Sequence, residues 1–398
     1  MKSAKRITIA CCGVHALQDG LGAALYVLLP LLAQNFGLSY AQVGIVRAAQ
    51  STPMALLELP SGIMAERFGE SRLLIFGLTC AAIGYLALSF ALGLWTLMAC
   101  LFVAGTGAAF QHSLASSLIS KGTGDSTRRA ALGAYNASGD AGKLAFTGIL
   151  TVGIGMGLAW QNVVSLLGVM SLIGVVALWV LLRGLFVARR SAAPAAARLA
   201  NAPTRWGVRH RVGFTTLISI VFFDTAVGTG FLTFVAFMMI DKQLPAGLAV
   251  FATTLTLAGG VFGKFGCGYL AQRSGVIRAL IIMKCLSALG IVAALLAPTF
   301  IAYCLLPVLG FALQGSSSIT YASVSDLIHA DRQARGFALI YTVANVAGVL
   351  GPVMFGIVGD RLGMTIAMLA MALVALLLVP MSLLLRPALD STAAVVTN

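Results

Sequence analysis

Apolar stretches of 20 residues or more recur along the whole chain, separated by short segments that carry glycine, proline or charge. A helix needs about 20 apolar residues to cross the hydrocarbon core of a bilayer. The 398 residues are 59% hydrophobic and only 10% charged, a composition that excludes an ordinary water-soluble domain. We therefore predict an all-α membrane protein, because a helix satisfies its own backbone hydrogen bonds without water.

Hydropathy and turn signals together predict twelve transmembrane helices. They lie near residues 10–33, 41–64, 73–93, 95–119, 130–152, 162–186, 212–240, 246–270, 277–297, 299–326, 336–358 and 365–385. If the N-terminus is cytoplasmic, nearly all Lys and Arg fall in cytoplasmic segments, and the periplasmic loops hold only Lys242 and Arg361. By the positive-inside rule we expect a multi-pass protein of the bacterial inner membrane with both termini in the cytoplasm.

The formal net charge of +14 is largely explained by this loop asymmetry. It therefore gives no reason to expect nucleic acid as a partner, and the lipid bilayer is the expected surroundings. The seven cysteines lie in apolar stretches, where we expect free thiols that pack as small hydrophobes and neither disulfides nor a metal site.

A self-match at a constant offset divides the chain into two halves. Residues 62–72 resemble residues 268–278, and the same offset of 206 relates Tyr135 to Tyr341 and Gly142 to Gly348. Such a repeat predicts duplication of a six-helix unit, with the halves related by a pseudo-two-fold axis along the membrane normal. We predict an N-terminal half at 1–187, a basic cytoplasmic linker at 188–211 and a C-terminal half at 212–398.

The segment Gly62-Ile-Met-Ala-Glu66-Arg67-Phe-Gly69 resembles the Gly-x-x-x-Asp-Arg-x-Gly signature of the major facilitator superfamily, with Glu in place of Asp. The resemblance implies the twelve-helix fold of that family, in two six-helix pseudo-repeats, and transport by alternating access. It also implies a gating role for the signature and its second copy; the alternative is a solvated turn that holds helix hairpins. The predicted gating residues are Glu58, Gly62, Glu66, Arg67, Gly69, Lys264, Gly268 and Arg273.

The N-terminal residues 15–39 resemble one branch of this superfamily. His15-Ala-Leu-Gln-Asp19-Gly, Leu28-Leu-Pro30 and Phe36-Gly-Leu-Ser39 are similar to the fosmidomycin-resistance branch and related exporters of small drugs and organic anions.

Ionisable side chains at membrane depth are costly, so each one is a functional hypothesis. His15 and Asp19 are four residues apart and share one face of the first helix, where a carboxylate beside an imidazole can take up and release a proton. We predict that they couple transport to protons, together with Asp224 at the corresponding position of the seventh helix. The alternative is that His15 and Asp19 only fix the first helix to its neighbours through hydrogen bonds.

Lys143 is expected to pair with Asp140, three residues earlier in the fifth helix. Glu58 and Lys264 are related by the repeat and carry opposite charges, which suggests a lock between the halves. The buried cations and anions balance, and they are Arg47, Lys143, Lys264 and Lys284 against Asp19, Glu58, Asp140 and Asp224.

Arg47 has no obvious partner on its own helix, and a guanidinium suits a carboxylate, phosphate or phosphonate, which favours an anionic substrate. The predicted substrate-binding residues are Arg47, Gln111, His112, Lys143, Gln314, Tyr341 and Asn345.

These observations predict a secondary active transporter that exports a small organic anion or drug in exchange for protons. An uptake carrier or a lipid-handling transporter of the same fold is the alternative. An enzyme or sensor is disfavoured, because the sequence holds no nucleophile motif, metal motif or nucleotide-binding loop. We expect no cofactor and no metal, and we expect a monomer whose partners are the solute, protons and lipids.

The predicted orientation can be tested by cysteine labelling. A membrane-impermeant maleimide should label Gly93→Cys in intact spheroplasts and Gly124→Cys only after permeabilisation, because the two loops lie on opposite faces. Native cysteines are first replaced by serine as the background control. Labelling of Gly124→Cys in intact spheroplasts would reverse the predicted topology.

Overall fold

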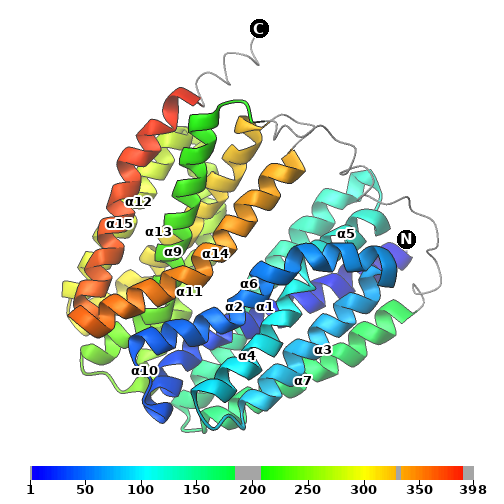
Figure 1. The fold of residues 1–398 in the computed structure, drawn as a ribbon, viewed down its shortest axis with the longest axis horizontal. Helices are drawn as coiled ribbons and strands as arrows, with labels where there is room; N and C mark the ends of the chain where they lie inside the picture. Colours follow the sequence, from blue (N-terminus) through cyan, green and yellow to red (C-terminus); the bar gives the residue numbers. More distant parts are fainter. Residues whose placement is uncertain (1, 184–207, 329–332, 389–398) are drawn as a thin grey trace. The chain divides into compact units, whose positions relative to one another are not determined.

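The chain is almost entirely helical in a computed structural model that describes residues 2–183, 208–328 and 333–388 (Figure 1). The first helices are α1 (Lys2–Phe36), α2 (Tyr40–Phe68), α3 (Glu70–Leu88), α4 (Leu94–Ala109), α5 (His112–Gly122), α6 (Asp125–Gly155) and α7 (Trp160–Leu182). The later ones are α9 (Arg211–Asp241), α10 (Ala246–Ala249), α11 (Phe251–Ser274), α12 (Val276–Leu296), α13 (Thr299–Leu327), α14 (Gln333–Leu362) and α15 (Met364–Leu384). The all-α prediction is confirmed.

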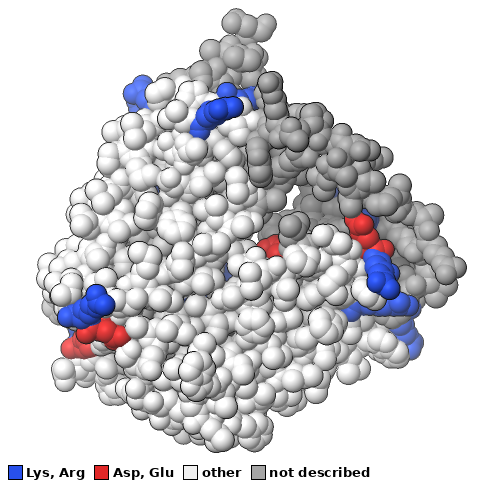
Figure 2. All heavy atoms as spheres, in the orientation of Figure 1, with Lys and Arg blue, Asp and Glu red and all other residues white. Residues whose placement is uncertain are grey.

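Within the described residues, ten helical segments are long and apolar enough to cross a membrane. Helices α2 and α6 are not among them, because polar and charged residues interrupt them, such as Arg47 in α2 and Asp140 and Lys143 in α6. On the face that Figure 2 draws, broad areas carry no charged side chain. Large apolar side chains such as Phe262 and Phe300 are exposed on the described surface, which suits contact with lipid.

Contacts divide the chain into two compact units. Unit 1 holds Met1–Phe36 and Ala49–Pro203, and unit 2 holds Gly37–Ala48 and Thr204–Asn398. The start of α2 therefore belongs to unit 2 and its remainder to unit 1. The predicted linker 188–211 lies almost wholly outside the described residues, and its role stays a prediction.

The two units repeat one packing scheme. In unit 1, α1 packs along α6, and α3 packs against α4 and α7. In unit 2, the equivalent helices make the equivalent pairs, with α9 along α14 and α12 against α13 and α15 (Figure 1). This correspondence agrees with the duplication that the offset of 206 predicts.

Small residues let α1 and α6 approach closely, as they commonly do in membrane proteins. A Cβ added to Gly142 would collide with the backbone of Ala16, and one added to Gly20 would meet the backbone of Gly142 and the ring of Phe146. The two backbones therefore lie near enough for side chains of α1 and α6 to share one polar cluster.

The fourth predicted span, 95–119, corresponds to one candidate membrane span at Leu94–Gly122, which has a local break that the sequence did not predict. The helix stops at Ala109 and restarts at His112, because Phe110 and Gln111 leave the helical conformation with φ, ψ of −99°, 27° and −120°, −67°. At the end of α4, the N–H groups of Phe110 and Gln111 donate hydrogen bonds to the carbonyl oxygens of Gly107 and Ala108, three residues earlier, as in a 3₁₀ turn. The break places Gln111 and His112 at the start of α5.

The close contact between α1 and α6 predicts a contrast between two glycines of α6. Gly142→Val should lower the midpoint of thermal unfolding in detergent by several degrees, because overpacking costs about 1–3 kcal/mol. Gly148→Val is the matched control, since a Cβ there meets nothing within 4 Å. Equal unfolding midpoints for the two variants would contradict the packing described.

Candidate functional site

The polar cluster of unit 1, which we call the His15 cluster, consists of His15, Asp19, His112, Asp140 and Lys143. Lys143 Nζ lies 3.0 Å from Asp19 Oδ2 and 3.3 Å from Asp140 Oδ1. The predicted Asp140–Lys143 pair is therefore confirmed. The contact between Lys143 and Asp19 was not predicted, since it depends on how closely α1 and α6 pack.

His15 is held in one orientation by α6. Its Nδ1 lies 2.7 Å from the carbonyl oxygen of Tyr135, and the two rings stack at 4.0 Å. A carbonyl oxygen has no hydrogen to give, so Nδ1 must donate, and proton exchange is left to Nε2. Nε2 lies 3.3 Å from Asp19 Oδ2. Gly139 leaves room for the ring, because a Cβ there would collide with it.

The break between α4 and α5 supplies the remaining side of the cluster. His112 Nε2 lies 3.7 Å from Asp19 Oδ1, and the His112 ring meets that of His15 edge-on at 5.2 Å. Gln111 is fully buried and its amide lies 3.4 Å from the Tyr135 hydroxyl. The break thus brings the imidazole of His112 to the carboxylate of Asp19, which a straight helix need not do.

The side chains of the His15 cluster differ in their exposure to solvent and in their charge. His112 and Lys143 keep 34% and 29% of their side chains exposed, whereas His15 keeps only 7%. With both imidazoles neutral, two carboxylates and one ammonium leave one net negative charge. A single proton neutralises the cluster, and the two exposed side chains give a proton or solute a route to it.

A metal ion is a less suitable occupant than a proton. The ligand atoms of His15, Asp19 and His112 all lie within 4.8 Å of one another. However, the ammonium of Lys143 already contacts the Asp19 carboxylate, and it would repel a divalent cation placed there.

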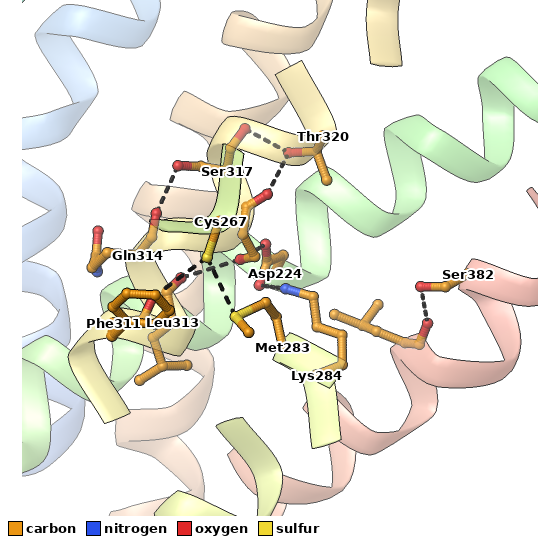
Figure 3. A network of polar contacts seen from close by, with 12 residues as sticks. Asp224, Cys267, Met283, Lys284, Phe311, Leu313, Gln314, Ser317, Thr320 and Ser382 are labelled. Carbon is orange, nitrogen blue, oxygen red and sulfur yellow. Dashed lines mark hydrogen bonds and ion pairs between the residues drawn. The ribbon is translucent and has the colours of Figure 1, made fainter. Parts of the chain in front are cut away.

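Unit 2 holds a second, more deeply buried pair on the equivalent first helix. Asp224 of α9 forms an ion pair with Lys284 of α12, and Ser316 of α13 donates a hydrogen bond of 2.7 Å to the same carboxylate. Figure 3 shows Asp224 and Lys284 pointing toward each other between these helices. Their side chains are 9% and 1% exposed, so this pair has little access to solvent.

The sequence identified both charges but missed their pairing. Lys284 is the one Lys or Arg between Arg278 and Arg332, and Asp224 is the one acid of α9 before its last residue. Two isolated residues of opposite charge in the same half could have predicted this ion pair, because each charge needs a partner in an apolar interior.

The other predicted binding residues are distributed over unit 2. Gln314 lies on α13 beside Gly228 and Gly260, and Figure 3 shows it in the Asp224 network. Tyr341 of α14 is half exposed and lies 5.1 Å from the ring of Tyr321. Arg47 lies in the segment of α2 that belongs to unit 2, and Asn345 is half-buried on α14. Their binding roles stay predictions.

In each predicted gating turn the arginine lies over an aromatic ring, although the two rings are at non-equivalent positions. Arg67 lies over the ring of Phe68 and Arg273 over that of Tyr269, at 5.4 and 4.7 Å. The close helix approach expected at Gly62 and Gly268 is absent among the described residues, since a Cβ at either would meet nothing within 4 Å.

Glu58 lies on the part of α2 in unit 1 and Lys264 on α11 in unit 2. Their lock stays a prediction, as do the gating roles of Glu66, Gly69 and the other turn residues.

Comparisons with known proteins agree on one family. The model of the Major Facilitator Superfamily (MFS) matches residues 11–252 and residues 216–396. An uncharacterized MFS-type transporter of Bacillus subtilis (strain 168), YfnC, is 28% identical over 375 residues, which cover 92% of this chain and 89% of that protein.

Two solved structures share the fold. Both are crystal structures of a bacterial homolog to the human lysosomal transporter Spinster in inward-facing conformations. The occupied form has 15% identity, covers 97% of both chains and gives a TM-score of 0.80. The unoccupied form has 16% identity, covers 98% of both chains and gives a TM-score of 0.81.

The buried ion pair of Asp224 and Lys284 in unit 2 gives a prediction about stability. Lys284→Met should strongly destabilise the protein, since removing one partner of a buried ion pair typically costs about 3–5 kcal/mol. The double variant Asp224→Asn with Lys284→Met should recover most of the loss, because no uncompensated charge remains. Thermal unfolding in detergent measures both, and a double variant as unstable as Lys284→Met would contradict the pairing.

Proposed function

The chain belongs to the Major Facilitator Superfamily, and from this premise we propose that it is a proton-coupled transporter that exports a small organic solute. Transport of a small solute follows from the family; the coupling ion, direction and substrate are our proposal. The observation that carries the proposal is the His15 cluster, which combines a fixed imidazole, a shared carboxylate, and a lysine and a second imidazole that are partly exposed, within one unit.

The proposed proton cycle uses Asp19 as the shared partner. Without a proton, Asp19 contacts Lys143 and faces His15 Nε2. A proton taken up at His15 Nε2 is donated toward Asp19, and a proton placed on Asp19 itself removes the carboxylate's charge. In either case the pull of Asp19 on Lys143 weakens, and Asp140 remains as the second partner of Lys143.

The sign of the substrate's charge decides the direction of coupling. A cationic drug competes with the proton for Asp19, so the two exchange, and an inward proton gradient then drives export. An organic anion binds more strongly once the proton weakens the Asp19–Lys143 pair, so anion and proton travel together. The cluster therefore favours a cationic or protonatable drug for export, whereas an anionic substrate fits the alternative of uptake.

Several finer proposals accompany this function. We propose a place in the bacterial inner membrane with both termini cytoplasmic, supported by the distribution of Lys and Arg. The similarity of residues 15–39 to the fosmidomycin-resistance branch supports drug efflux. Arg47, Gln111, His112, Lys143, Gln314, Tyr341 and Asn345 are the proposed substrate contacts.

The proposal is tested in liposomes that contain a pH-sensitive dye. The panel contains cationic drugs, small organic anions and phosphonates. Wild-type protein should give a pH change that depends on one of these compounds, with proton exit from an acid-loaded lumen for an exchanged cation and proton co-entry for an anion.

Asp19→Asn should abolish the solute-dependent pH change, because the amide cannot exchange a proton. Asp241→Asn is the matched control, since it makes the same change on an exposed carboxylate at the end of α9. Wild-type coupling by Asp19→Asn would overturn the role of the His15 cluster. Solute flux without any pH change in wild type would overturn proton coupling.

A further inference from the structure

Helices α1 and α5 of unit 1 pack against each other along matching stripes of residues. Residues 7, 11, 14 and 18 share one face of α1, because steps of three and four residues follow the turn of a helix. Residues 122, 118, 115 and 111 take the same steps in the opposite direction along α5 and the residue before it. The stripes face each other, since a Cβ on Gly122 would collide with Ile7 and the rings of His15 and His112 lie 5.2 Å apart.

This contact is apolar except at its last level. The earlier levels are buried in one hydrophobic cluster, which contains Ile7, Cys11, Val14, Ala115 and Leu118. The next step along the stripes is Gln18 in α1 and Gln111 at the break between α4 and α5. The antiparallel register therefore places these two amides at the same level of adjoining helices.

Both amides are buried and have unused capacity for hydrogen bonds. The exposed fraction is 4% for Gln18 and 0% for Gln111. Gln111 Nε2 lies 3.4 Å from the Tyr135 hydroxyl. Gln111 Oε1 and both polar atoms of the Gln18 side chain have no hydrogen-bond partner among the described residues. Because a buried polar group without a partner is costly, two such amides at one level indicate a shared ligand.

A water molecule has the hydrogen-bonding groups that these atoms require. Its two hydrogens can be donated to Gln18 Oε1 and Gln111 Oε1, and its lone pairs can accept from an amide N–H. Buried waters typically make about three hydrogen bonds to polar groups that the protein leaves unsatisfied. An ion is a less suitable ligand, because both side chains are neutral and would leave its charge uncompensated.

We propose that Gln18 and Gln111 bind an internal water molecule, which ties the break between α4 and α5 to α1. Gln111 directly precedes His112, whose Nε2 lies 3.7 Å from Asp19 Oδ1. A water that holds Gln111 therefore also holds His112 beside this carboxylate, and the two glutamines are positioning residues of the His15 cluster. The water site is independent of the proposed function, and only its effect on proton coupling rests on that function.

Radiolytic footprinting of the full chain in lipid nanodiscs tests the water directly. Protein equilibrated in ordinary water is mixed rapidly into heavy-oxygen water and exposed to X-rays, which turn water into hydroxyl radicals that oxidise adjacent side chains. An internal water exchanges more slowly than bulk water. Phe110 and Tyr135, the neighbours of Gln111, should therefore still gain ordinary oxygen at short mixing times.

The double variant Gln18→Met with Gln111→Met should lose this retained label, because methionine is similar in length and offers no amide. Gln34→Met is the matched control, since it makes the same change on an exposed glutamine of α1. Heavy-oxygen label or no label at Phe110 and Tyr135 in wild type would overturn the water site. A retained label in the double variant would do the same.

Thermal unfolding in detergent tests whether the two amides share their ligand. Gln18→Met and Gln111→Met should each lower the unfolding midpoint by several degrees, because each leaves the other amide without its full set of bonds. The double variant should recover most of the loss. Losses that simply add in the double variant would contradict a shared ligand. Footprinting separates a shared water from a direct bond between the amides.

The pH profile of transport tests the positioning role. In the liposome assay, Gln18→Met should move the pH at which solute-dependent proton flux is half-maximal, because His112 is no longer held beside Asp19. Gln18→Ser should restore the wild-type profile, since its hydroxyl and the space beside it admit water. An unchanged profile in Gln18→Met would overturn the positioning role. If wild type carries no compound of the panel, the proposed function fails, and footprinting still decides whether the water is bound.

Discussion

A carboxylate inside a bilayer needs a cation or hydrogen-bond donor close at hand, and both units meet this need on their first helix. Asp19 and Asp224 each contact a lysine of the same unit. The backbone packing is arranged around these contacts. Gly139 and Gly142 bring α6 onto α1, and the break after Ala109 brings His112 to Asp19. An unpaired charge at such depth would cost several kcal/mol.

The two aspartates occupy equivalent positions of the repeat, whereas the lysines that pair with them do not. The position equivalent to Lys143 in unit 2 is Val349, and the position equivalent to Lys284 in unit 1 is Leu78, at the offset of 206. The lysine partner therefore lies on a different helix of the repeat in each unit, α6 in unit 1 and α12 in unit 2. The equivalents of the imidazoles are Ile220 for His15, at the offset of 205 that relates the aspartates, and Ser318 for His112. The imidazoles beside the aspartate are thus a feature of unit 1 that unit 2 lacks at the equivalent positions, and the predicted role of Asp224 in proton coupling stays a prediction.

The helices and the repeat could be predicted because they depend on local composition. The length of an apolar stretch predicts whether it can cross the membrane. The repeat is found by comparing residues at a constant offset in the sequence, which requires no three-dimensional structure. The pair of Asp140 and Lys143 was also predictable, since helical spacing alone brings them together. The contacts of Asp19 with Lys143 and of Asp224 with Lys284 join different helices, and their distances depend on glycine packing that no spacing rule encodes.

Two further features lay outside sequence reasoning for the same reason. The break at Phe110 contains no proline, so the usual breaker signal is missing. The bond from the Tyr40 N–H at the start of α2 to the carboxylate of Asp360 joins residues 320 positions apart, so no local sequence pattern predicts it.

The net charge of the His15 cluster gives a physical reason for the proton coupling that we propose. With neutral imidazoles the cluster carries one negative charge, and enclosing it away from water costs several kcal/mol. A proton or a bound cation removes that charge, so the site can be enclosed when either occupies it. Removing the empty, unprotonated cluster from water is therefore the unfavourable case, because its negative charge stays uncompensated. Under the proposed proton coupling, the transporter would therefore cross between its two access states in the protonated or cation-bound form, and exchange would follow.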